Sequence, residues 1–244
     1  MVPRRIVYYN LFSLISFRQG VSHAFGVPAL GLGSSMFAFG AYLKSSGFDL
    51  FQSFASSFFT FALPGQFVMA ETMLAGGTFL NIFLAVFLTN ARLFPMTVNL
   101  IPIIRHSSHS KWKYYFLAHF IAVTSWFNMF AVHKQLQQQD KFDYFLGLGG
   151  FLWFNAVICT MLGFSISHLV SHEFLIGLVF INPIYFLIMT VSNLNEKKLT
   201  TSVILGAVFS VVLYQYTPEW SVLIAGIASG TLGFFIFKKE NNDS

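Results

Sequence analysis

The stretch VFLTNARLFPM, residues 86–96, lies inside an apolar run that extends over residues 78–104. Arg92 stands near the middle of this run, with Asn90 and Pro95 close by. A guanidinium that faces lipid at the centre of a bilayer costs at least about 2.5 kcal/mol. We therefore expect Arg92 to face the interior of a helix bundle or a water-filled cavity.

The composition of the whole chain predicts an all-α, polytopic membrane protein. Of its 244 residues 55% are hydrophobic and 9% are charged, whereas a soluble domain carries about 25% charged residues. The apolar runs approach or exceed the roughly 20 residues that cross a hydrocarbon core about 30 Å thick. Runs such as LNIFLAVFL, residues 80–88, lack the alternation of transmembrane β-strands.

Eight hydrophobic segments are predicted, separated by turn and charge signals. They cover about 21–43, 48–75, 78–104, 113–133, 142–165, 174–193, 199–216 and 219–237. We expect one integral membrane domain over 1–244, with residues 1–20 as an interfacial leader. The path of 48–75 stays open, because this segment either crosses the membrane or dips in and returns at Pro64 and Gly65.

Two prolines predict discontinuous helices. Pro28 lies in GVPALGLGSS, which also contains Gly31 and Ser34, and Pro64 lies in FALPGQF, followed by Gly65 and Gln66. A proline inside a helix removes one backbone hydrogen bond, and in lipid the freed carbonyl must find another partner. Since transporters bind substrates where helices unwind, both stretches are candidate substrate sites. Ordinary proline kinks are the alternative.

The predicted third segment carries a polar face. Asn81, Arg92 and Asn99 follow at intervals of eleven and seven residues, which is about three and two helical turns. Glu71 is the predicted partner of Arg92 in an ion pair, and a substrate carboxylate is the alternative, since a guanidinium binds two carboxylate oxygens at once. Asn90 would add a neutral hydrogen bond.

Several stretches together resemble the AzlC family of branched-chain amino acid permeases. They are GVSHAFGVPALGLGSSMFAFG, FALPGQFVMAETMLAGGTFLNIFLAVFLTNARLFPM and FLGLGGFLWFNAVICTMLG. The resemblance covers most of the chain, and it is strongest over about 20–105. It implies an exporter of small apolar amino acids in the plasma (inner) membrane of a bacterial-type cell. It also implies a small AzlD-like partner subunit and the use of a proton gradient.

One motif departs from that family. Where its members commonly have Thr-Asp-Glu, this chain has Thr124, Ser125 and Trp126. The missing carboxylates leave the coupling ion open, and Glu71 or His119 is the candidate for a titrating group in their place.

Other classes of function find little support in the sequence. Cys159 is the single cysteine, so neither an intrachain disulfide nor a cysteine-based zinc site is expected. No catalytic, cofactor, metal or nucleic-acid motif is predicted, and we do not expect an enzyme. The alternatives that remain are an accessory membrane subunit without transport activity and a transporter of a different small carboxylate-bearing solute.

Overall fold

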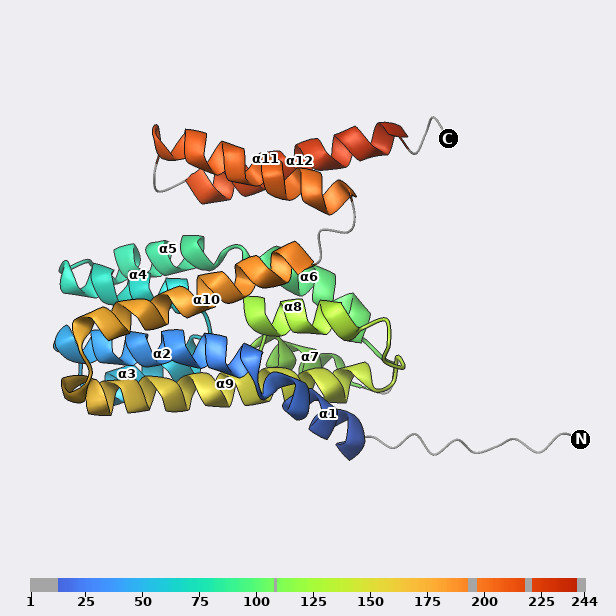
Figure 1. The fold of residues 1–244 in the computed structure, drawn as a ribbon. Coiled ribbons are helices and arrows are strands. Elements are labelled where there is room, and N and C mark those ends of the chain that lie inside the picture. Colours follow the sequence, from blue (N-terminus) through green and yellow to red (C-terminus); the bar gives the residue numbers. More distant parts are fainter. Residues whose placement is uncertain (1–12, 108, 193–196, 218–220, 241–244) are drawn as a thin grey trace, which may run out of the picture. The chain divides into compact units, whose positions relative to one another are not determined.

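The computed structural model describes residues 13–107, 109–192, 197–217 and 221–240, and all elements in these ranges are helices. The predicted all-α class is therefore confirmed for this part of the chain. The chain divides into two compact units, 1–185 and 186–244, so that the single predicted domain stays a prediction. Figure 1 shows the helices and their labels.

The axis of the first unit is α9, Lys141–Ile166. Its 26 residues span about 39 Å at 1.5 Å per residue, and they pass without a break through the bundle (Figure 1). Trp153 stands at its midpoint. We name the two ends of the bundle after this helix, as the Lys141 end and the Ser167 end.

A broken helix runs parallel to α9. It consists of α1, Leu14–Ala24, and α2, Val27–Ser45, which meet at an angle of 59°. Gly20 of α1 packs on the backbone of Tyr144, and Gly163 of α9 packs on the backbone of Phe37 in α2. The predicted interfacial leader over 1–20 overlaps α1 at residues 14–20, which pack on α9, and its position at a membrane interface stays a prediction; residues 1–12 lie outside the described residues.

A hairpin follows, made of α3, Leu50–Phe59, and α4, Leu63–Leu74. Ser57, near the end of α3, bonds to Thr160 of α9. After the break, Phe67 packs against Phe39 and Tyr42 of α2, so α4 runs back toward the end where α3 began. This segment thus enters from the Ser167 end and returns, and the crossing alternative for 48–75 does not describe it.

The next pair, α5 (Phe79–Asn90) and α6 (Leu93–Ile104), crosses the bundle toward the Lys141 end. The two helices are bent by 50° at Ala91 and Arg92. The expected continuous polar face of Asn81, Arg92 and Asn99 is therefore wrong, because the break changes the helix direction between its members.

A second hairpin consists of α7, Lys111–Ala118, and α8, Val123–Val132. Tyr114 packs on Phe142 at the start of α9, and Phe120 packs on Trp153 at its middle. The chain then returns to Lys141, where α9 begins. The predicted single helix over 113–133 is therefore wrong, since residues 119–122 interrupt it. Figure 1 shows the two hairpins at opposite ends of α9.

The remaining helices are α10 (His172–Ser192), α11 (Lys197–Tyr214) and α12 (Ser221–Glu240). The short helix η1, Ser167–Leu169, joins α9 to α10. In the second unit α11 and α12 pack closely, with Gly233 against Ser202 and Gly206 against Ser229. These helices coincide with the last three predicted segments, and their crossing of a membrane stays a prediction.

The structure does not confirm eight membrane spans. Among the described residues one helix, Lys141–Leu169, is long and apolar enough to cross a membrane by itself; counting each bent pair as one span gives up to three. Basic residues of the first unit lie mainly at the Lys141 end, namely Arg18, Arg105, Lys111, Lys113, Lys134 and Lys141, whereas Lys44 lies at the Ser167 end.

Candidate functional site

The breaks of the first unit meet beside the middle of α9. The carbonyl oxygen of Phe58, in the last turn of α3, accepts hydrogen bonds from His119 Nε2 and Trp153 Nε1, both at 3.1 Å. The last carbonyls of a helix have no partner within it, so these two side chains stabilise the end of α3. A carbonyl cannot donate, and His119 therefore carries its proton on Nε2.

A buried chain of hydrogen bonds fixes the amide group of Gln66. Thr160 Oγ1 donates to the carbonyl oxygen of Ala156 at 2.9 Å, so Ser57 Oγ, 2.8 Å away, must donate to Thr160. Ser57 then accepts from Gln66 Nε2 at 3.0 Å. Gln66 is 0% exposed, and its Oε1 has no hydrogen-bond partner in the described structure. The amide oxygen of Gln66 is thus a free acceptor in the first turn of α4.

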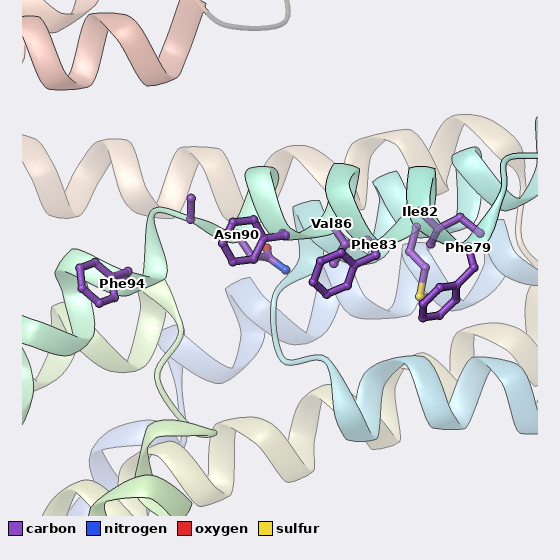
Figure 2. A pocket seen from close by; sticks show the side chains of 9 residues that line it. Phe79, Ile82, Phe83, Val86, Asn90 and Phe94 are labelled. Carbon is purple, nitrogen blue, oxygen red and sulfur yellow. The ribbon is translucent and has the colours of Figure 1, made fainter.

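Asn90 connects the break between α3 and α4 with the break between α5 and α6. Its carboxamide lies on Gly65, at the place where a Cβ of that residue would be. Asn90 Oδ1 is buried and, like Gln66 Oε1, has no partner among the described residues. Asn90 also lines an open groove of about 680 Å³ along α5, with apolar neighbours on α4, α5 and α6. Figure 2 shows Asn90 after Val86 along α5, and Phe94 beyond the break.

The first break supplies a separate cavity of about 470 Å³ between α2, α9 and α10. Ser34, Asn155 and Cys159 are polar residues that line it, and Asn155 Nδ2 donates to the carbonyl oxygen of Ala29 at 3.0 Å. The helix breaks at Gly26, whose φ of 133° suits glycine, and Pro28 lies in the first turn of α2.

Among the predicted residues of this first stretch, Pro28 is half-buried, while Gly31 packs against the side chain of Tyr185. At the second break Pro64 is exposed in the first turn of α4. The three residues therefore shape the helix starts, whereas Ser34 faces a cavity.

The predicted ion pair does not form in this structure. Arg92 is exposed at the break between α5 and α6, and Glu71 is exposed near the end of α4. Because α4 and α5 form an antiparallel hairpin and Gly65 touches Asn90, Glu71 lies near the turn of this hairpin and Arg92 beyond its open end. The structure thus places Asn90 against Gly65, the residue before Gln66, and leaves Glu71 apart.

The motif Thr124, Ser125 and Trp126, which differs from the family's Thr-Asp-Glu, lies at the break between α7 and α8. Ser125 Oγ accepts from the Ala122 amide at 2.9 Å and bonds to the Phe120 carbonyl at 2.6 Å. Thr124 and Ser125 are both buried, and Asn128 Nδ2 donates to the Thr124 carbonyl at 2.7 Å. This motif therefore closes the helix end with neutral groups.

Sequence reasoning missed the partners of Gln66 and His119. Ser57 is 9 residues from Gln66 and Phe58 is 61 residues from His119, and the bonds of these two residues to Thr160 and Trp153 of α9 span 103 and 95 residues of chain. One signal was available, since Ser53, Ser56 and Ser57 place hydroxyls on one face of an otherwise apolar segment.

One comparison with known proteins identifies a family. Residues 28–170 match the family described as AzlC protein, whereas no curated protein and no solved structure matches the chain. The matched range contains α2 apart from its first residue, the three pairs α3/α4, α5/α6 and α7/α8, and α9, whereas α1 lies outside it. Members of this family are membrane transporters of amino acids. The chain belongs to the AzlC family.

Proposed function

We propose that this protein exports small apolar amino acids of the branched-chain type across the plasma (inner) membrane by secondary active transport. A small AzlD-like membrane subunit would be its partner. The observation that carries the proposal is the meeting of broken helices beside Trp153, with free amide oxygens on Gln66 and Asn90. Transporters commonly bind their substrates at such unwound helices near the bilayer midplane.

The two ends of an amino acid find complementary groups at α4. No side chain caps the start of this helix, and free amides at a helix N-terminus bind a carboxylate. Arg92, two residues after Asn90, adds positive charge at the adjoining break. The oxygens of Gln66 and Asn90 would accept hydrogen bonds from the substrate ammonium group.

The groove along α5 accommodates an aliphatic side chain. Its walls are apolar apart from Asn90, with Met69 and Val86 among them. A missing methylene in such a pocket changes affinity by only about 1–3 kcal/mol. We therefore expect loose selectivity among valine, leucine, isoleucine and methionine.

The proposal is tested by counterflow of these four labelled amino acids in proteoliposomes, with and without the partner subunit, at two pH values. Wild-type protein should exchange them. Gln66→Leu should lose exchange, because it removes the buried acceptor. The matched control is Gln135→Leu, which changes an exposed glutamine outside the site and should retain exchange.

Two outcomes would overturn the proposal. Absence of exchange by wild type, even with the partner, would favour the accessory-subunit alternative. Exchange of another carboxylate-bearing solute but of none of the four amino acids would change the substrate class.

A further inference from the structure

A buried carboxylate lies at the Lys141 end, outside the proposed substrate site. Asp143, in the first turn of α9, is 2% exposed. Its Oδ2 accepts the backbone N–H of Ser13 at 2.6 Å, while its Oδ1 is buried without a hydrogen-bond partner among the described residues. A buried carboxylate with one unsatisfied oxygen is costly while it is charged, and binding a proton relieves that cost.

A histidine packs on Phe142, the residue before this carboxylate, and lies within the range of its charge. His109 stacks on Phe142 with ring centroids 4.1 Å apart and 22° between the planes, and its Nδ1 is likewise buried without a partner in the described structure. Burial and the nearby Lys113 lower the pKa of His109, and the charge of Asp143 partly opposes them. The other titratable groups that act on this pair are Asp140 and His106.

Other titratable groups of the first unit are engaged or open to solvent. Glu71 is exposed, and His119 donates to the Phe58 carbonyl near the bundle centre. Asp140, one turn before Asp143, accepts the hydroxyl proton of Ser16 at 2.9 Å. Asp143 is the carboxylate, within the described ranges, that combines full burial with a free oxygen.

We propose that Asp143 and His109 form the proton-binding site that couples transport to a pH difference. Asp143 Oδ1 holds the proton as a neutral carboxylic acid, and the imidazole of His109 exchanges it with the compartment at the Lys141 end. This inference rests on the proposed transport function and names the coupling groups that it needs.

Protonation at this place has a structural consequence. The bond from Ser13 to Asp143 is assisted by the carboxylate charge, and such bonds are roughly twice as strong as neutral ones. A neutral Asp143 therefore weakens the attachment of α1 to α9. The chain bends between α1 and α2 at Gly26. Binding of the proton therefore changes how firmly α1 is held on the far side of this bend.

The first test compares two assays in proteoliposomes with labelled leucine. A difference of one pH unit can drive at most about tenfold accumulation per proton, because one pH unit is about 1.36 kcal/mol. Wild type should approach this ratio. Asp143→Asn should not accumulate leucine, yet it should retain counterflow, because Asp143 lies about 15 Å along α9 from Trp153.

Asp140→Asn is the matched control, since it alters an aspartate one turn away that also bonds to the start of α1, and it should accumulate leucine like wild type. Accumulation by Asp143→Asn at the wild-type level would overturn the inference. If wild type shows no counterflow at all, the proposed function fails instead, and a second readout then decides the proton site.

That readout is reaction with dicyclohexylcarbodiimide, which modifies protonated carboxyl groups in apolar surroundings, followed by peptide mapping of purified protein. We expect modification of Asp143 that decreases in one step as the pH rises from 5 to 8, with the step displaced in His109→Gln. Absence of modification at Asp143 throughout this range, or an unchanged step in His109→Gln, would contradict the site.

Discussion

A single hydroxyl completes the break between α7 and α8. Ser125 is fully buried and satisfies the Ala122 amide and the Phe120 carbonyl at once. Replacing it by alanine leaves two buried backbone groups without partners, and each such group costs about 1–3 kcal/mol. We predict that Ser125→Ala lowers the free energy of unfolding by at least this amount, measured by thermal unfolding in detergent.

Ser165→Ala provides the comparison for this variant. Ser165 is exposed on α9 and bonds to the Met161 carbonyl, whose helical environment persists without the hydroxyl. Exposed substitutions of this kind usually stay within about 0.5 kcal/mol of wild type. Equal stability of the two variants would show that Ser125 does not stabilise the break.

Part of the site could be predicted from individual residues. The motif FALPGQF and the later Asn90 indicated Gly65, Gln66 and Asn90, and the structure places Asn90 on Gly65, beside Gln66 in the chain. Their role in substrate binding stays a prediction. The partners of Gln66 could not be predicted, because its bond to Ser57 exists only if the segment turns back on itself. The ion pair of Arg92 with Glu71 was inferred from charge alone. The sequence did not show that the α4–α5 hairpin places these two residues at its opposite ends.

At the scale of elements, glycines set how closely the helices approach α9. A Cβ at Gly163 would overlap the backbone carbonyl of Phe37 in α2, whereas a Cβ at Gly150 would meet nothing within 4 Å. Small residues that allow backbone contact are typical of helix pairs in membranes. Overpacking such a contact usually costs about 1–3 kcal/mol.

We therefore predict that Gly163→Ala lowers the midpoint of thermal unfolding clearly. Gly150→Ala should leave it unchanged or raise it slightly, because alanine favours a helix by up to about 1 kcal/mol over glycine. Both residues lie on α9, so the comparison separates helix propensity from contact with α2. The same small effect in both variants would contradict close packing at Gly163.

The loop between α6 and α7 is expected to respond to acid. Folding lowers the pKa of His109 below its usual 6.5, first through burial and then through Lys113. The unfolded chain then takes up a proton before the folded protein does, so stability is complete above pH 6.5 and falls as the pH drops toward the folded pKa.

We predict that wild type loses more stability between pH 7.5 and pH 5 than His109→Gln does, when both are measured by thermal unfolding in one detergent. His168→Gln changes an exposed histidine at the Ser167 end and should keep the wild-type profile. A His109→Gln profile parallel to wild type would show that this imidazole is not buried as described.

The helix breaks differ in how well the sequence predicts them. Pro28 and Pro64 lie in the first turns of α2 and α4, so proline indicated these breaks to within a few residues. At residues 119–122 no proline is present, and the break there depends on the buried hydroxyl of Ser125. An apolar run by itself carries no sign of such an interruption.

For the molecule as a whole, the two hairpins explain why the count of eight spans exceeds what the structure supports. Two short apolar helices in succession have the same length in sequence as one membrane span, and run length cannot separate the two cases. The contacts with α9 distinguish a hairpin from a single span. In the described structure, the α3–α4 hairpin contacts the Ser167 half and the centre of α9, and the α7–α8 hairpin contacts the Lys141 half and the centre.

This arrangement also accounts for the distribution of charge. With eight crossings, the basic loops at 105–110 and 133–140 would face opposite sides of the membrane. With α7 and α8 as a hairpin, both loops lie at the Lys141 end, together with most basic residues of the first unit. Basic loops favour the cytoplasmic side, so we expect the Lys141 end to face the cytoplasm.

The central claim is that broken helices and hairpins from both ends meet beside Trp153, and labelling of single cysteines tests it most directly. In a Cys159→Ser background, an impermeant maleimide would be applied to intact cells and to inside-out vesicles carrying Ser107→Cys, Gln135→Cys or Ser45→Cys. The account predicts that Ser107→Cys and Gln135→Cys react only in inside-out vesicles and Ser45→Cys only in intact cells. Reaction of Ser107→Cys and Gln135→Cys from opposite sides would contradict it.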